Sequence, residues 1–158
     1  MAILIRLGEA AEVDAAVSVY ERSNLVRRQG TWPGRVARVE QVRSRLRDPG
    51  SWFLLATDGP AVVGMASAEA LRGEDGAGPV LPDGCFLNLL YVVPERWGEG
   101  IGGAILDATL AEARQRRYSR IHLWTHEDNE RSHRLYCRRG FSPTGRTLDG
   151  KSEWAREL

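Results

Sequence analysis

A chain of 158 residues, 42% of them hydrophobic, is long enough for one domain with its own core, because a chain of about 150 residues buries roughly 68–70% of its unfolded surface. Its 22 basic and 21 acidic residues leave a formal net charge of +1, which excludes a strong overall field toward nucleic acid or an anionic membrane. We find no basic and apolar leader at the start and no run near the ~20 apolar residues of a membrane span, so we expect a soluble, cytoplasmic protein.

Apolar spacing and turn residues predict the elements that follow along the chain. In order, they are a helix from about Val13 to Asn24, a helix from Val36 to Leu46, a hairpin of strands 52–57 and 61–70, a loop over 72–84, a buried central strand over 85–93, a helix from Ile101, a strand over 121–125, a helix capped by Asp128 or Asn129 and ended by Gly140, and a last hairpin of strands 141–147 and 153–157. This order predicts one mixed α/β sheet with helices on both faces.

The two cysteines give no sign of a metal or disulfide site. Cys85 and Cys137 lie outside any CxxC spacing, and no cluster of His and Cys has the spacing of a zinc finger. We expect both to be buried free thiols in a reducing compartment, and we expect no metal site.

Two glycine motifs match the residue patterns of nucleotide-binding loops, but the segments around them do not match the secondary structure that such loops require. The segment from Gly145 to Ser152 matches GxxxxGK[ST], yet residues 153–158 leave no room for the helix that a P-loop needs, which favours a turn between two strands. Gly98, Gly100 and Gly103 match GxGxxG, but residues 94–97 separate them from the strand and too little chain follows for a dinucleotide-binding sheet.

The same glycines have a third interpretation when residues 92–103 are taken as one block between a strand and a helix. Closely spaced glycines let several backbone N–H groups converge, and the helix N-terminus adds partial positive charge at that point. The block therefore predicts a cradle for a diphosphate.

This block resembles motif A of the GNAT family of acetyl-CoA-dependent N-acetyltransferases, a strand and V-x-P followed by [RQ]-x-x-G-x-[GA] at a helix start. Gly100 and Gly102 match the last two positions, whereas the Arg or Gln position falls on Trp97, with Arg96 displaced by one residue. A second signature, N-x-x-A-x-x-L-Y-x-x-x-G-F, is similar to the segment from Asn129 to Phe141, with Ser132 in place of the alanine. The resemblance covers essentially the whole chain.

The resemblance implies a single domain over residues 1–158 with the acyl-CoA N-acyltransferase fold, in which the central mixed sheet splays at the fourth strand. It implies that acetyl-CoA is the acetyl donor. The residues that it assigns to acetyl-CoA are Leu90, Tyr91 and Val92 for the pantetheine arm and thioester, Trp97, Gly98, Glu99, Gly100, Ile101, Gly102 and Gly103 around the diphosphate, and Asn129 and Ser132 near the pantetheine.

For catalysis, Tyr136 matches the family's general acid, although a tyrosine in an apolar helix stripe also suits core packing. An amine attacks only when neutral, so a base or a proton relay to water is required. Glu69 is the first candidate for the base, Asn88 could position a water molecule, and a chain of ordered waters stays open. His122, His126 and His133 suit structural or exposed positions better.

The acceptor is expected to be a primary amine of a small molecule or protein, with no nucleic acid or membrane partner and with a homodimer as a reasonable assembly. The loop with Trp32, Pro33 and Gly34 resembles the family's acceptor-lining loop, and Arg27 and Arg28 could bind an acceptor carboxylate. The basic helix with Arg131, Arg134, Arg138 and Arg139 is either a solvated face or a partner of the 3′-phosphate of CoA. The alternative to an enzyme is an acyl-CoA-binding regulatory module without turnover.

Overall fold

The structure is a computed structural model, and it describes residues 2–29 and 38–158. Its helices are α1 (Val13–Gln29), α2 (Val39–Arg47), α3 (Ile101–Gln115) and α4 (Glu130–Arg138), with short 3-10 turns η1 (Ala10–Glu12), η2 (Glu74–Gly76) and η3 (Pro94–Arg96). Its strands are β1 (Leu4–Leu7), β2 (Ser51–Asp58), β3 (Ala61–Arg72), β4 (Val80–Val92), β5 (Arg120–His126), β6 (Ser142–Leu148) and β7 (Lys151–Glu157).

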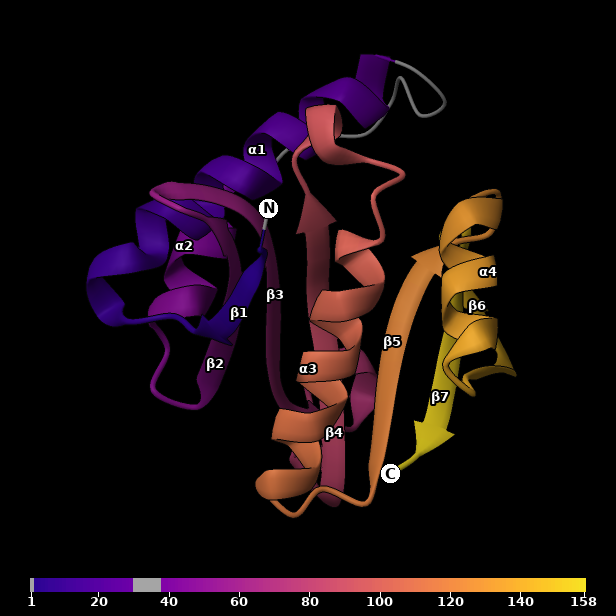
Figure 1. Cartoon of the computed structure of the whole chain (residues 1–158). Helices are drawn as coiled ribbons and strands as arrows, with labels where there is room; N and C mark the ends of the chain where they lie inside the picture. Colours follow the sequence, from indigo (N-terminus) through magenta and orange to yellow (C-terminus); the bar gives the residue numbers. More distant parts are fainter. Residues whose placement is uncertain (1, 30–37) are drawn as a thin grey trace. The chain divides into compact units, whose positions relative to one another are not determined.

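The strands form one mixed sheet in the order β1-β2-β3-β4-β5-β7-β6 (Figure 1). β1 and β2 are antiparallel, β4 and β5 are parallel, and β7 is antiparallel to both β5 and β6. The chain separates into two compact units, which we describe one at a time. Unit 1 holds the residues up to Ser67 together with Leu89–Thr109, and unit 2 holds Ala68–Asn88 and Leu110–Leu158.

In unit 1, α1 and α3 pack on opposite faces of the sheet. The virtual Cβ of Gly64 on β3 would lie 2.5 Å from Cδ1 of Ile105 on α3, so this helix approaches the strand too closely for a side chain there. The amide of Val93 donates to the carbonyl of Val63, which places Val92 opposite Gly64 and turns Tyr91 to the other face. There, the Tyr91 ring meets Tyr20 of α1 edge-on, with 5.3 Å between ring centroids.

In unit 2, α4 covers the sheet through aromatic contacts with β7. The rings of His133 and Tyr136 lie 5.1 Å and 6.5 Å from the Trp154 ring, and Phe141 lies 5.6 Å from Tyr136. Along β5 the side chains of Ile121, Leu123 and Thr125 are buried in alternation with less buried neighbours, as expected for a strand with two unlike faces.

The mixed sheet and most elements confirm the sequence prediction, including the hairpin at 149–150 in place of a P-loop. Two expectations were wrong and one strand was missed. The helix α1 continues to Gln29 instead of ending near Asn24, β4 begins at Val80 within the segment expected to be a loop, and no strand was predicted at β1. The predicted splay of the central strand at a bulge near Leu90, Tyr91 and Val92 stays a prediction. The described parallel ladder between β4 and β5 runs from Gly84↔Arg120 to Leu87↔Leu123.

The cysteine prediction was right for Cys85, which is a buried free thiol, and wrong for Cys137, which is free but exposed on α4. None of the helices within residues 2–29 and 38–158 is both long and apolar enough to cross a membrane.

Candidate functional site

The predicted site residues divide between the two units. Unit 1 contains residues 90–92 at the end of β4 and residues 97–103, which lead into α3. Unit 2 contains Glu69, Asn129, Ser132 and Tyr136. The predicted acceptor loop at Trp32, Pro33 and Gly34 and the side chain of Arg28 lie outside the described part of the chain.

The loop before α3 has the backbone that a diphosphate cradle requires. Gly98 and Gly100 adopt positive φ angles of 87° and 82°, so the peptide alternates in handedness across Glu99. The first helical hydrogen bond runs from the amide of Ala104 to the carbonyl of Gly100, and the three amides before Ala104 therefore have no acceptor within the helix. A Cβ on Gly100 would meet nothing within 4 Å, and residues 98–100 are exposed, so a ligand can approach this backbone.

Arg96 connects this loop to β2, and its positive charge is paired with carboxylates of the protein. Its guanidinium donates to Glu99 at 2.9 Å and 3.0 Å through Nε and to Asp58 of β2 at 2.9 Å through Nη1. The hydrogen bonds that Arg96 donates, first to Glu99 and then to Asp58, raise the pKa of its guanidinium above the ordinary value. The residue displaced by one from the family position thus neutralises Glu99 beside the cradle and ties the loop to β2.

Trp97, at the position of the family's Arg or Gln, contacts the chain's own backbone. Its indole Nε1 donates to the carbonyl of Val92 at 2.7 Å, and Ser23 Oγ of α1 donates to the same carbonyl at 3.0 Å. A carbonyl oxygen has two lone pairs, so both are engaged within the protein. A pantetheine held at the end of β4 would therefore use other backbone groups of residues 90–92.

The C-terminal half of α1 lies against the same segment of unit 1. The guanidinium carbon of Arg27 sits 5.1 Å from the Tyr91 ring centroid and 5.5 Å from that of Trp97. Arg22, one turn earlier, pairs with Glu95 of η3. Sequence reasoning did not single out Ser23 or Arg22, because they only interrupt an apolar stripe and their partners lie 69 and 73 residues away.

In unit 2, Asn129 is the N-cap of α4, as predicted. Its Oδ1 accepts from the amide of Ser132 at 3.2 Å, which satisfies one amide of the first helical turn. Gly140 follows the helix with a φ of 81°, the left-handed conformation expected after a helix end. The second signature therefore corresponds to a complete, capped helix.

Tyr136 lies on the buried face of α4, only 7% exposed, between the rings of Phe141 and Trp154. Glu69 is half-buried on β3 in the same unit. The structure brings together Asn129, the N-cap of α4, and Ser132 and Tyr136 on that helix.

Two of the three histidines have described contacts with other parts of the fold. His122 Nδ1 lies 3.3 Å from Glu153 Oε2, and Glu153, 4% exposed, also accepts from Thr144 at 2.8 Å and from Arg146 at 3.1 Å. His133 Nε2 lies 3.0 Å from the carbonyl of His126. Of the basic residues on α4, Arg131, Arg134 and Arg138 are exposed, which fits either role considered for them.

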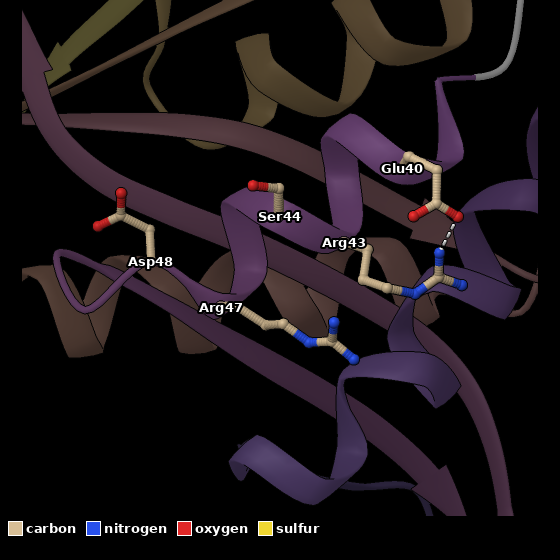
Figure 2. A pocket seen from close by; sticks show the side chains of 5 residues that line it. All are labelled: Glu40, Arg43, Ser44, Arg47 and Asp48. Atoms are coloured by element: carbon tan, nitrogen blue, oxygen red, sulfur yellow. Dashed lines mark hydrogen bonds and ion pairs between the residues drawn. The ribbon is translucent and has the colours of Figure 1, made fainter.

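A separate surface depression lies along α2 (Figure 2). It is lined by Glu40, Arg43, Ser44, Arg47 and Asp48, none of them a predicted site residue. Arg43 pairs with Glu40 and also with Asp14 of α1, so its charge is matched within the protein. In the described part of the chain, no group of three or more His, Cys, Asp or Glu side chains is placed to hold a metal ion.

Comparisons with known proteins agree with the motifs. A family model described as "Acetyltransferase (GNAT) family" matches residues 13–141. A mycothiol acetyltransferase of Kineococcus radiotolerans is 36% identical over 118 residues, which are 72% of this chain but only 33% of that protein, so the chain spans about a third of its length.

Solved structures share the whole fold. The PaiA N-acetyltransferase of Thermoplasma acidophilum in complex with coenzyme A has a TM-score of 0.78 at 16% identity, with 100% of each chain covered. The ribosomal-protein-S18-alanine N-acetyltransferase of Escherichia coli has a TM-score of 0.77 at 17% identity, covering 99% of this chain and 94% of its own. At such identities the likeness shows the fold and leaves the acceptor open.

Proposed function

Because the chain belongs to the GNAT family of acetyltransferases, we propose that it transfers acetyl from acetyl-CoA to a primary amine by direct attack in a ternary complex. The observation that carries this proposal is the exposed loop in which Gly98 and Gly100 take positive φ angles just before the first-turn amides of α3. That loop fits a diphosphate in shape and in donors.

The proposed CoA-binding residues keep the assignments that the motifs imply. Backbone groups of Leu90, Tyr91 and Val92 would hold the pantetheine arm, except for the Val92 carbonyl, which Ser23 and Trp97 already engage. The loop of Trp97, Gly98, Glu99, Gly100, Ile101, Gly102 and Gly103 would hold the diphosphate. Asn129 and Ser132 at the start of α4 would contact the pantetheine.

Bound acetyl-CoA supplies an acetyl group activated as a thioester. The amine must first lose its proton, because an alkylammonium has no lone pair for attack. Glu69 or a relay of ordered waters would accept that proton. As the new C–N bond forms and the C–S bond breaks, the nitrogen would release its second proton to solvent. Tyr136 would donate its hydroxyl proton to the departing sulfur and take one back from solvent.

We further propose that residues 1–158 act as one domain in the cytoplasm, a reducing compartment that suits the free thiols of Cys85 and Cys137. The acceptor class is a small molecule or a peptide amine, and the mycothiol acetyltransferase relative favours a small molecule. We also propose a homodimer. The strands β1 and β6 lie at the two edges of the sheet, where a second copy could pair with them.

The test is release of CoA thiol from acetyl-CoA across a panel of amines, with Tyr136→Phe beside the unchanged chain. We expect release that requires an amine, a fall in kcat of about tenfold or more in Tyr136→Phe, and a nearly unchanged KM for acetyl-CoA. Equal kcat in the variant would remove Tyr136 from the mechanism. Thermal stabilisation by acetyl-CoA without release for any amine would instead support the regulatory binding module.

A further inference from the structure

A buried carboxylate, that of Glu153 on β7, connects three strands of unit 2. Glu153 is only 4% exposed, and it accepts hydrogen bonds from Thr144 and Arg146 of β6 at 2.8 Å and 3.1 Å. On β5, Nδ1 of His122 lies 3.3 Å from the Oε2 atom of the same carboxylate. A buried carboxylate with several partners is held in one position, so Glu153 fixes the orientation of the imidazole beside it.

These contacts indicate which nitrogen of His122 carries the proton. Because Arg146 donates to the carboxylate of Glu153, that group acts as an acceptor, and the Nδ1 atom facing it is the nitrogen that bears hydrogen. In a neutral imidazole the other nitrogen, Nε2, then has a lone pair. Within the described part of the chain, the polar contact of this ring is the one at Nδ1, and the side chain is 19% exposed. His122 is therefore a base that a carboxylate orients and that solvent reaches.

His122 and Tyr136, the proposed general acid, lie on opposite faces of the sheet in unit 2. In the ladder between β5 and β7, Leu123 pairs with Trp154, and the Tyr136 ring packs 6.5 Å from the Trp154 ring. His122 precedes Leu123 along β5, so its side chain points to the other face, as does the side chain of Glu153. The two rings therefore lie on the two sides of β5 at the same level of the ladder.

Acetyl transfer needs its acid and its base at different positions around the carbonyl carbon. In direct attack, the amine nitrogen and the sulfur are both bonded to this carbon in the tetrahedral intermediate. A group that takes a proton from the nitrogen and a group that protonates the sulfur must therefore approach from different directions. With Tyr136 serving the sulfur, a base on the opposite face of β5 is placed on the side of the nitrogen.

We propose that His122, oriented by Glu153, receives the proton of the acceptor amine at the end of the relay of ordered waters. The ammonium gives one proton to the nearest water, the relay delivers a proton to Nε2, and the neutral amine then attacks the thioester. The carboxylate of Glu153 stabilises the imidazolium, which later gives its proton to solvent. This inference rests on the proposed acetyl transfer. It makes His122 the proton acceptor and Glu153 a positioning residue.

The experiment compares two acceptors in the thiol-release assay on the full chain, near neutral pH. One is an amine that the chain accepts, and the other is its analogue with fluorine on the neighbouring carbon. Fluorine withdraws electrons and lowers the pKa of the amine, so the analogue is already neutral and needs no base. In His122→Asn, whose amide can still donate to Glu153, kcat for the ordinary amine should fall about 100-fold, while kcat for the fluorinated amine and KM for acetyl-CoA should stay within about threefold.

Chemical rescue tests the same step without the fluorinated amine. His122→Ala removes the ring, and imidazole added to the assay should then restore a rate that rises with its concentration, after subtraction of the release without enzyme. Imidazole should not accelerate the unchanged chain.

Two further variants make the result specific. His126→Gln changes a histidine on the same face of the same strand, and it should keep the kcat of the unchanged chain with both amines. Glu153→Gln keeps the shape of the side chain without its charge, and it should lower kcat for the ordinary amine more than for the fluorinated one. Melting temperatures of all variants show whether each is folded.

The outcomes separate the two proposals. An unchanged kcat in His122→Asn, or an equal loss with both amines, overturns this inference and leaves the acetyltransferase proposal standing. Failure of imidazole to restore any rate in His122→Ala likewise overturns it. No release by the unchanged chain with any amine overturns both.

Discussion

Cys85 and Cys137 differ in reactivity because only one of them meets water. Cys85 is 0% exposed, and burial raises the pKa of its thiol to about 12, while nearby Arg116 opposes the shift and Glu69 adds to it. The thiolate is the reactive form, so Cys85 should be inert near neutral pH. We expect one thiol per chain to react with a disulfide reagent at pH 8 in the folded protein, and two after unfolding.

The control is Cys137→Ser, which should abolish labelling of the folded chain. Rapid reaction of two thiols in the native protein would contradict the buried position of Cys85. The same variant also removes the background signal from thiol-release assays.

Glu12 makes a local contribution to acid stability. Hydrogen bonds from Arg6, at 2.7 Å and 2.8 Å, and from the amide of Glu9 lower the pKa of Glu12 from its ordinary value of 4.5 to about 2. A folded pKa below the unfolded one means that the stabilisation is complete above about pH 4.5 and is lost as the pH falls toward 2. The urea midpoints of the unchanged chain and Glu12→Gln should therefore differ most near pH 6 and converge near pH 2.

A constant difference between these two midpoints from pH 6 to pH 2 would contradict this assignment, since it would show that the effect of Glu12 does not depend on its charge.

At this scale the sequence predicted residues whose role depends on near neighbours in the chain. Asn129 caps α4 through Ser132, and Gly140 ends that helix, because a cap is a local arrangement. The hydrogen bond from Arg96 to Asp58 joins residues 38 apart, and the exposure of Cys137 depends on which face of α4 is covered. Both depend on the tertiary structure, so the spacing of residues in the sequence could not predict them.

The cap of α4 also links stability to the proposed site. Asn129→Ala removes the acceptor for the amide of Ser132 and should cost about 1 kcal/mol, seen as a melting temperature lower by roughly 2–4 °C. Asn129→Ser keeps a capping oxygen and should regain most of that loss. If Asn129 also contacts pantetheine, the KM for acetyl-CoA should stay raised in Asn129→Ser even though stability recovers.

Recovery of that KM together with stability would show that Asn129 acts only as a helix cap. A fully stable Asn129→Ala variant would instead contradict the cap itself.

Element boundaries were less predictable than element order. The apolar stripe of α1 is interrupted at Ser23 and Asn24, yet both are fully buried, and Ser23 Oγ donates to the carbonyl of Val92 at the end of β4. Strand β1 has four residues with two of them, Leu4 and Leu7, exposed, so its alternation is too short to stand out. The start of β4 was missed because Pro82, Asp83 and Gly84 are residues typical of turns, and Asp83 does adopt a positive φ within the strand.

For the whole molecule, the predicted mixed sheet was correct, since the alternation of helices and strands is a property of the entire chain. The residues proposed to bind and use acetyl-CoA lie in both units, with the loop at Gly98–Gly100 in unit 1 and Tyr136 in unit 2. Their common role was inferred from two motifs that occur in family order. Binding of CoA by the loop and catalysis by Tyr136 can be tested separately. Binding comes first, because Tyr136 can act only on bound acetyl-CoA.

The central claim is that the backbone of this loop binds the diphosphate of CoA, and acetyl-CoA affinity by titration calorimetry tests it most directly. Gly100→Ala and Gly145→Ala form a matched pair, because both glycines have positive φ, 82° and 91°, and open space around a Cβ. Each substitution should cost roughly 1 kcal/mol of stability. We predict that Gly100→Ala weakens acetyl-CoA binding by about tenfold or more, or roughly 1.4 kcal/mol, while Gly145→Ala binds as the unchanged chain does; equal affinities for all three proteins would contradict the claim.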